Sequence, residues 1–383
     1  MGMGNLPEGP AEECPAGGVA LGRASSEHGR VAHTSGGNTS PLSAAGRLAL
    51  AVLLALPFVA SAWTLILTTS FLVEFLGQGR WRPLSVLTRE PLVRPLPVFL
   101  PASAGARPVP VDLYTRAGLR RAAGLVLVHG VAPEGKDDAR LREAAAQLAR
   151  SGFAVAVPTV EGLTVLRLRP EDADTVGAAV NALHSTGYRR VAVLGISLGA
   201  GPALLAASDP TVASRLSAVL ALGGYASAVE LLRYTLTGAY AFGGVTGRAA
   251  TVLEPAIAQF ARANGELMDA AGRRLVDNRD PALVDQRVRE LPKPTRDLLA
   301  ALSPGPTVGR LEAPLFLIHG REDPAVPFTE SLRLEAAARA AGRPVRTAIV
   351  GAVGHVEADL RAGLGDLLQL WATFYAFRRA VEG

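Results

Sequence analysis

The feature that most constrains this 383-residue chain is the pentapeptide Gly-Ile-Ser-Leu-Gly at residues 195–199. It follows an apolar, strand-like run at residues 190–194 and precedes small apolar residues typical of a helix start. A strand that turns directly into a helix has no room for side chains beside the turn, so glycine is expected at Gly195 and Gly199. The segment predicts that Ser197 lies on a sharp, strained strand-to-helix turn. Taken alone, Ser197 could equally cap a helix.

Two later loops carry residue types that could activate this serine. A strand-like run after residue 313 leads to a turn with Asp323, and a second run, residues 345–350, leads to a loop with His355. In this arrangement His355 takes the proton of Ser197, and Asp323 orients the imidazole and stabilises its charged form. All three residues follow the carboxyl ends of predicted parallel strands, where active sites of such sheets gather.

Each of these assignments has a competitor. Glu322 and Glu230 compete with Asp323 as the acid, and Asp323 could instead be a turn-forming residue before proline. The pattern His-Gly-x-x-Asp-x-x-Val-Pro favours Asp323. His355 could be an ordinary histidine of a surface loop.

Two other histidines stand beside glycines at predicted strand ends. We interpret His129 as shaping the loop that would bind the oxyanion, and His319 as holding the loop of the acid. The backbone N–H groups of Leu198 and Val131 are the expected oxyanion donors, because one follows the nucleophile and the other follows the His129-Gly130 strand end.

The Gly-x-Ser-x-Gly turn and the chain order Ser197, Asp323, His355 resemble the α/β-hydrolases, over residues from about 95 to 383. The compact layout is similar to the dienelactone hydrolase group. That group commonly uses a cysteine nucleophile, so the serine implies ester-type hydrolysis here. Haloalkane dehalogenases and epoxide hydrolases carry an aspartate at this turn. Prolyl oligopeptidase relatives share the triad but carry a large propeller, for which the chain offers no room.

The rest of the chain alternates strand and helix, which predicts a mostly parallel sheet flanked by helices. Antiparallel edge strands are expected at residues 96–100 and 109–114, and helices at 137–150 and 171–184. A long helix-prone stretch, residues 229–308, is interpreted as a cap over the site, with an extra helical layer as the alternative. Its aromatic residues Tyr234, Tyr240 and Phe242 either line an acyl pocket or pack the cap, and packing is the expectation for each.

The N-terminal part has a different composition. Residues 1–46 lack apolar periodicity and are expected to be a disordered tail. Residues 47–73 are predicted to form a transmembrane helix, since residues 48–73 carry no charge and about 20 apolar residues span a bilayer. Residues 74–94 would link this single-pass membrane anchor to the domain at 95–383. The alternatives are a signal peptide cleaved near Ala62, with export of the domain, and a buried core helix.

Charge and cysteine content exclude some classes of function. The formal net charge is +5, but the arginines are scattered without a basic run, so nucleic-acid binding is not expected. The single cysteine, Cys14, cannot form an intrachain disulfide or a zinc cluster. No phosphate loop or metal-ligand helix is apparent, and no cofactor is expected. The expected partners are a small acyl substrate and a membrane; the oligomeric state stays open.

These observations predict a serine hydrolase that cleaves a carboxylic ester, thioester or lactone through an acyl-enzyme on Ser197. An acyltransferase on the same triad is the second hypothesis, because only the acceptor of the acyl group differs. A catalytically silent, membrane-tethered binding protein is the third.

Overall fold

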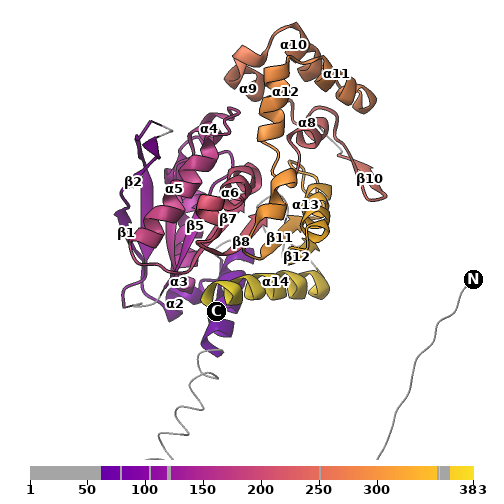
Figure 1. The fold of residues 1–383 in the computed structure, drawn as a ribbon. Coiled ribbons are helices and arrows are strands. Elements are labelled where there is room, and N and C mark those ends of the chain that lie inside the picture. Colours follow the sequence, from indigo (N-terminus) through magenta and orange to yellow (C-terminus); the bar gives the residue numbers. More distant parts are fainter. Residues whose placement is uncertain are drawn as a thin grey trace, which may run out of the picture. The chain divides into compact units, whose positions relative to one another are not determined.

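The structure is a computed structural model, and it describes residues 62–77, 80–102, 105–118, 122–249, 252–351, 353 and 363–383. Its centre is an eight-stranded sheet in the order β1-β4-β6-β5-β7-β8-β11-β12 (Figure 1). The strands are β1 (Leu92–Pro95), β4 (Val111–Thr115), β5 (Ala123–Val128), β6 (Phe153–Pro158), β7 (Val191–Ile196), β8 (Leu216–Leu222), β11 (Leu315–Gly320) and β12 (Val345–Val350). The pairings from β6 through β12 are parallel, whereas β4 runs antiparallel to β6 and β1 antiparallel to β4.

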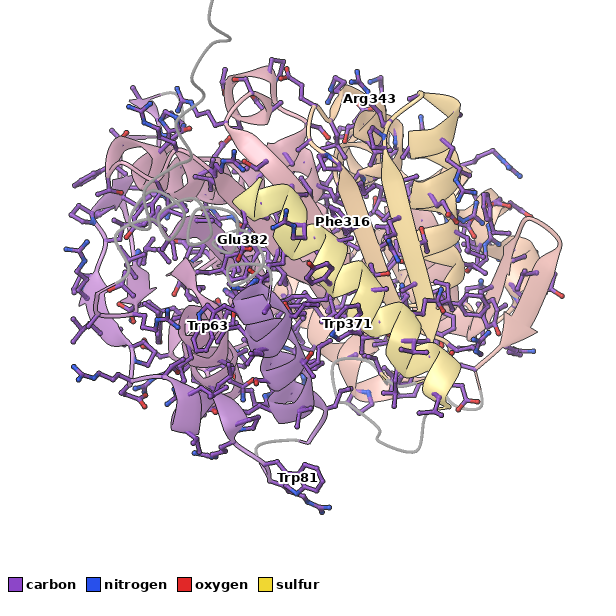
Figure 2. The ribbon with its side chains drawn as sticks, turned by 90° about the horizontal axis from the view of Figure 1, so that it is seen from below. Trp63, Trp81, Phe316, Arg343, Trp371 and Glu382 are labelled. Atoms are coloured by element: carbon purple, nitrogen blue, oxygen red, sulfur yellow. The ribbon has the colours of Figure 1, made fainter. Side chains whose placement is uncertain are left out.

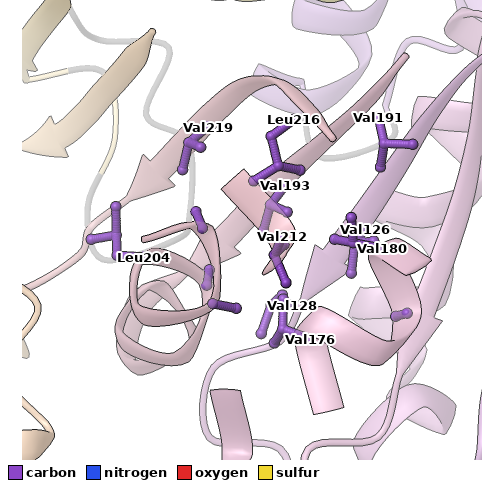
Figure 3. Close-up of a cluster of buried hydrophobic side chains, with 14 of the residues drawn as sticks. Val126, Val128, Val176, Val180, Val191, Val193, Leu204, Val212, Leu216 and Val219 are labelled. Atoms are coloured by element: carbon purple, nitrogen blue, oxygen red, sulfur yellow. The ribbon is translucent and has the colours of Figure 1, made fainter. Parts of the chain in front are cut away.

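Helices cover both faces of the sheet, because side chains of each strand alternate between two apolar clusters. Val126 and Val128 of β5 belong to one cluster, and Leu125 and Leu127 belong to the other. Figure 3 shows the first cluster, with valines of neighbouring strands packed against helix side chains. The first face carries α5 (Asp172–Ser185), α6 (Ala200–Ala207) and α13 (Thr329–Ala340), and the second carries α3 (Ala139–Ser151) and α14 (Leu364–Glu382).

The predicted helices over residues 137–150 and 171–184 are found as α3 and α5, within two residues at each end. Both ends of α3 follow from local chemistry. The Asp138 carboxylate accepts hydrogen bonds from the N–H groups of Arg140 and Leu141, and Gly152 ends the helix with φ of 121°.

The first strands differ from the prediction of an edge strand at residues 96–100. β1 ends earlier, and β2 (Val98–Phe99) pairs with β3 (Pro108–Val109) in a separate two-stranded sheet. Pro95 and Pro97 have no N–H to donate to a ladder, which explains why one continuous strand does not form there.

A long insertion separates β8 from β11. It contains α8 (Ala228–Thr237), a hairpin of β9 (Ala239–Phe242) and β10 (Val245–Arg248), then α9 (Glu254–Ala263), α10 (Ala270–Val276), α11 (Val284–Glu290) and α12 (Lys293–Ala301). α9 to α12 gather at the end of the domain opposite to α14 (Figure 1). The insertion has an apolar cluster of its own, and its β-hairpin was not expected from the sequence. The remaining short elements are α2 (Pro83–Leu87), α4 (Glu161–Val165), α7 (Pro210–Ala213) and the 3-10 turns η2 (Gly135–Asp137), η3 (Ser197–Gly199), η4 (Gly265–Leu267), η5 (Pro281–Leu283) and η6 (Gly305–Arg310).

Residues 62–76 form a helix that packs beside α14 (Figure 2). The Phe71 ring stacks on Phe374 with centroids 4.6 Å apart, and the Trp371 indole N–H donates to the Thr69 hydroxyl over 3.1 Å. Leu67 and Phe71 are buried in the same apolar cluster as the sheet. Their side chains therefore contact protein at positions where the transmembrane prediction placed lipid.

The prediction of a transmembrane helix over residues 47–73 is thus corrected for its described part. Within the residues that the structure describes, no helix combines the length and the apolar character that a membrane crossing needs. Residues 47–61 and the predicted disordered tail, residues 1–46, lie outside the described residues.

The predicted linker, residues 74–94, is tied to the domain. Glu74 is fully buried, and its carboxylate accepts a hydrogen bond from the Leu84 N–H over 3.0 Å. The other carboxylate oxygen lies 3.9 Å from an Arg150 Nη atom. Burial raises the pKa of Glu74, and the Leu84 hydrogen bond and Arg150 act against this rise.

A pair of substitutions tests the packing of the first helix. Phe71→Ala is expected to lower the free energy of unfolding by about 3 kcal/mol, because it empties a buried aromatic site. Ile66→Ala, on the exposed side of the same helix, is expected to cost less than about 1 kcal/mol. Urea unfolding of the full chain measures both. Equal, small effects would show that the helix does not pack on the domain.

Candidate active site

The strand-to-helix turn at Ser197 is strained, as the sequence predicts. β7 ends at Ile196, η3 follows directly, and Ser197 has φ of 53°, a left-handed conformation that is costly for a residue with a Cβ atom. A Cβ atom on Gly195 would lie 2.6 Å from the Cα atom of Ala200, and one on Gly199 would overlap the carbonyl oxygen of His129. Both glycines are therefore required by close backbone approach.

The loop after β5 packs against this turn. A Cβ atom on Gly130 would lie 3.1 Å from the Cβ atom of Ser197. The His129 Nε2 atom accepts a hydrogen bond from the Val160 N–H over 2.9 Å, so the ring proton is on Nδ1, which donates to the Gly130 carbonyl over 2.6 Å. Burial lowers the pKa of His129 and keeps the ring neutral. His129 thus fixes the loop with both ring nitrogens.

The two expected oxyanion donors line the same cavity as Ser197. Leu198 lies in the first helical turn, where N–H groups have no partner within the helix. The Val131 N–H has no hydrogen-bond acceptor among the described residues. The helix start and the loop after β5 thus each contribute one of these residues to the cavity wall that contains Ser197.

Asp323 lies in the tight loop after β11, with its side chain buried. One carboxylate oxygen accepts hydrogen bonds from the N–H groups of Ala325 and Val326, over 2.8 and 2.9 Å. The other lies 3.6 Å from His319 Nε2. His319 is itself within hydrogen-bond distance of the Val326 carbonyl and the Ser331 hydroxyl, so it holds the acid loop in place.

The two competing acids are placed differently. Glu322 is exposed to solvent, and Glu230 of α8 pairs with Arg233 and Arg333 over 3.3 and 3.2 Å. Of the three carboxyl groups, only that of Asp323 is buried in the loop whose residues Ala325 and Val326 line the cavity with Ser197.

His355 lies outside the described residues, so the structure does not place it. β12, the strand that precedes it, pairs in parallel with β11, the strand that precedes Asp323. The two loops therefore leave the sheet at the same edge.

The cavity beside Ser197 has a volume of about 970 Å³ and reaches under the insertion. Apolar residues of α8, α9 and α12 form much of its wall, including Leu231, Leu232, Ala256, Ile257, Phe260 and Leu299. The i, i+3, i+4, i+7 spacing of Leu253, Ala256, Ile257 and Phe260 marks an apolar helix face, but which surface this face covers does not follow from the spacing. Within the described parts of the chain, no group of three His, Cys, Asp or Glu residues could hold a metal ion.

The aromatic residues named from the sequence pack the insertion instead of lining the cavity. Tyr234 and Tyr240 have ring centroids 5.9 Å apart, and the Tyr234 hydroxyl donates to the Asp323 carbonyl over 2.8 Å. Phe242 lies under the Arg333 guanidinium, 4.6 Å from its centre. The expectation that each of these residues packs the insertion agrees with these contacts.

Two buried side chains attach the insertion to the sheet domain. The Glu330 carboxylate of α13 accepts hydrogen bonds from the N–H groups of Ala226 and Ser227, each over 2.9 Å, at the start of the insertion. Asn264, after α9, accepts from the Leu168 N–H over 2.8 Å and donates to the Leu166 carbonyl over 3.0 Å. Leu166 and Leu168, the partners of Asn264, line the cavity, as do Tyr225 and Ala228 beside the first attachment.

Comparison with known proteins places this geometry in a known fold. Acylaminoacyl peptidase from Pyrococcus horikoshii matches with 15% identity and a TM-score of 0.50 over 78% of this chain and 43% of that chain. A puromycin-hydrolyzing peptidase from Mycobacterium tuberculosis matches with 18% identity and a TM-score of 0.50 over 78% of this chain and 40% of that chain. Dienelactone hydrolase from Anabaena variabilis matches with 16% identity and a TM-score of 0.43 over 76% of this chain and 99% of that chain.

The chain thus spans about two fifths of the length of the two peptidases, and at these identities the likeness to them shows the fold. A search of curated proteins found no significant match.

The prolyl oligopeptidase family matches residues 240–377, a stretch that includes Asp323 and His355 and begins after Ser197. A match over these residues alone does not test the prediction that the chain has no room for a propeller. The chain has the α/β-hydrolase fold, and its predicted resemblance to the serine hydrolases of that fold is confirmed.

Proposed function

We propose that the protein is a serine hydrolase that works through an acyl-enzyme on Ser197. The observation that carries the proposal is the position of Ser197. It lies on a strained turn, 6% exposed, in the wall of a large cavity to which Leu198 and Val131 also belong. Strain of about 1–3 kcal/mol at one residue is typical of functional turns, because the surrounding structure must hold it in place.

In the proposed reaction, His355 takes the hydroxyl proton of Ser197 as the serine oxygen attacks the acyl carbon. The Leu198 and Val131 N–H groups stabilise the resulting oxyanion. His355 then gives the proton to the leaving group, and the acyl chain stays bonded to Ser197. A water molecule deprotonated by His355 attacks this acyl-enzyme, the bond between the acyl carbon and the Ser197 oxygen breaks, His355 returns the proton to that oxygen, and the acid is released. Asp323 orients His355 and stabilises its charged form.

The assignment of the base to His355 is supported by the state of the other histidines in the fold. His129 and His319 each use both ring nitrogens within the protein. His184 is exposed near the C-terminal end of α5. None of the described histidines is therefore available to Ser197, whereas His355 follows the strand next to that of Asp323.

The cavity supports a substrate with a large apolar acyl group, because its wall under the insertion is mainly leucine, isoleucine, alanine and phenylalanine. An ester, thioester or lactone of such an acid fits this cavity. We further propose that the insertion acts as a cap that selects substrates. The match to the prolyl oligopeptidase family favours a second candidate, a peptidase that cleaves an amide with an apolar residue in the same cavity. An acyltransferase would use the same triad with another acceptor.

The triad is tested with a fluorophosphonate probe, which labels only an activated serine. Ser197→Ala and His355→Ala are expected to abolish labelling, and Asp323→Asn to slow it by about 10⁴-fold, because the imidazole loses its orientation and tautomer. Ser208→Ala, a buried serine at the end of α6, is the control and should label normally. Labelling that persists in a folded Ser197→Ala variant would assign the nucleophile elsewhere.

The strain at Ser197 provides a stability readout. Ser197→Gly is expected to raise the free energy of unfolding by about 1 kcal/mol, because glycine adopts a φ of 53° without steric cost, while labelling is lost. Ser197→Ala should leave stability nearly unchanged, since alanine bears the same strain as serine. Thermal unfolding measures both variants. A destabilised glycine variant would contradict the strained turn.

The substrate class is tested with 4-nitrophenyl esters from acetate to octanoate and with N-acetyl-leucine 4-nitroanilide. For an acyl-binding cavity, kcat/KM should rise at least about 10-fold from acetate to octanoate, since each buried methylene contributes about 0.8 kcal/mol. Ala256 lines the cavity, so Ala256→Trp should fill the space for the longer acyl chain and remove this rise. Ala258 lies on the exposed side of α9, and Ala258→Trp should leave the rise in place. Faster cleavage of the anilide than of any ester would favour the peptidase.

A further inference from the structure

Asp172 is a buried carboxyl group in the wall of the same cavity, and the proposed reaction does not use it. It is the first residue of α5 and is 5% exposed. Its Oδ1 atom accepts a hydrogen bond from the Gly162 N–H over 3.2 Å and lies 3.8 Å from Arg169 Nε. No donor among the described residues lies within hydrogen-bond distance of Oδ2. Oδ1 thus holds α4 through Gly162, whereas Oδ2 accepts no hydrogen bond from the described residues.

The surroundings of Asp172 make room for this open oxygen. A Cβ atom on Gly162 would overlap Oδ2, so only glycine at that position lets the carboxylate lie where it does. Tyr225, another residue of the cavity wall, donates its hydroxyl proton to the Leu302 carbonyl over 3.0 Å. It is therefore not a donor to Asp172. The Tyr225 ring also packs closely on Gly201 of α6, the helix that begins beside Ser197.

The neighbouring cations in the wall have other partners. Arg169 pairs with Glu161 over 2.6 Å, and Arg167 pairs with Glu266 over 2.8 Å. Burial raises the pKa of Asp172 to about 6, and the Gly162 hydrogen bond and Arg169 only partly offset it. At pH 7.5 the carboxylate is ionised, and the fold bears the cost of a buried, incompletely paired charge.

We propose that Asp172 is a specificity-determining residue that binds a protonated amine on the acyl part of the substrate. The cavity then takes amino-acyl compounds, in which an apolar chain carries one ammonium group, in preference to plain fatty acyl compounds. An ammonium group donates up to three hydrogen bonds and neutralises the carboxylate, to which the Arg169 guanidinium comes no nearer than 3.8 Å. The proposal rests on the proposed function, since it names the substrate class of that site.

The test compares esters that differ only in the amine. 4-Nitrophenyl 6-aminohexanoate is paired with 4-nitrophenyl heptanoate, and 4-nitrophenyl 2-aminohexanoate with 4-nitrophenyl hexanoate. The wild-type protein is expected to prefer at least one amino ester by about 10-fold to 100-fold in kcat/KM, the range of a hydrogen bond to a charged group. Equal rates within both pairs would overturn the proposal.

Two substitutions assign the preference to Asp172. Asp172→Asn keeps an oxygen for the Gly162 N–H and removes the charge, so the ratio of amino-ester to fatty-ester kcat/KM should lose the preference measured for the wild-type protein. Asp174→Asn, an exposed carboxyl group on the same helix, is the matched control and should keep the preference. Gly162→Ala, which displaces Oδ2, should weaken the preference with the charge still present. An unchanged preference in Asp172→Asn would overturn the assignment.

The pH dependence of the preference gives an independent readout. The charged and titratable groups around Asp172 are Arg169, Glu161, Glu171 and Tyr225. Arg169 stays cationic, hydrogen bonds from Arg107 and Arg169 lower the pKa of Glu161, and burial raises the pKa of Tyr225. For 4-nitrophenyl 6-aminohexanoate, whose alkyl ammonium group keeps its proton throughout this range, the ratio of amino to fatty ester rates should therefore be full above pH 7 and fall as pH drops through about 6. The α-amino group of 4-nitrophenyl 2-aminohexanoate itself titrates at about pH 8 or below, so the pH profile uses the first pair. Titration of His355 affects both esters alike and cancels in the ratio.

Binding and stability separate the two proposals from each other. Calorimetry of the Ser197→Ala variant should show that heptylammonium binds at least about 10-fold more tightly than heptan-1-ol. The difference should vanish when Asp172→Asn is added to Ser197→Ala. Such binding without hydrolysis of any ester would overturn the proposed function and keep the amine site. Hydrolysis of the esters with neither a preference for the amino esters nor binding of heptylammonium would overturn the amine site and keep the proposed function.

The Tm of Asp172→Asn separates a binding role from a structural one. The folded-state pKa of Asp172 is raised, so its contribution to stability is present at low pH and lost as pH rises through about 6. At pH 7.5 the asparagine variant should therefore melt at or above the wild-type Tm. A large fall in Tm would show that Asp172 is structural.

Discussion

The structure depends on the close approach of two backbone segments, the end of β5 and the helical turn after β7. Gly199 leaves space for the His129 carbonyl, and Gly130 lies against Ser197. The buried ring of His129 ties this loop to Val160 on the neighbouring strand connection. Because packed interiors tolerate no extra atoms at such a point, the surrounding structure holds Ser197 in its strained conformation and fixes the loop and the turn relative to each other.

Polar anchors attach the insertion to the sheet domain near this unit. Glu330 fixes the start of the insertion, and Asn264 fixes its far side to the loop after α4. Between these anchors the amphipathic α8 and α9 contribute apolar residues to the wall of a cavity of about 970 Å³ that also contains Ser197. A charge buried among protein atoms interacts more strongly with a bound group, because water screens it less than at the surface. A carboxylate such as that of Asp172 therefore has a large effect on which substrates bind.

The N-terminal helix shows how an apolar sequence permits two structures. Residues 48–73 carry no charge, which suits a bilayer and a protein interior equally. In the described part, Phe71 stacks on Phe374 and Thr69 bonds to Trp371, both on α14. Thr69 and Trp371 are 302 positions apart in the chain. The Thr64 hydroxyl donates a hydrogen bond to the Glu382 carboxylate, 318 positions away. Local hydropathy carries no information about such pairs.

The sequence by itself determined the strand and helix order and the strained serine turn, because these follow from local periodicity and from glycines that backbone sterics demand. It also singled out Ser197 and Asp323, whose loops leave strands of one parallel sheet. Only the tertiary structure decided that Tyr234 and Tyr240 pack the insertion, that α8 and α9 line the cavity, and that one oxygen of Asp172 stays open. The physical reason is that burial and pairing are set by residues distant in sequence, and a single helix or loop does not specify which partner will cover it.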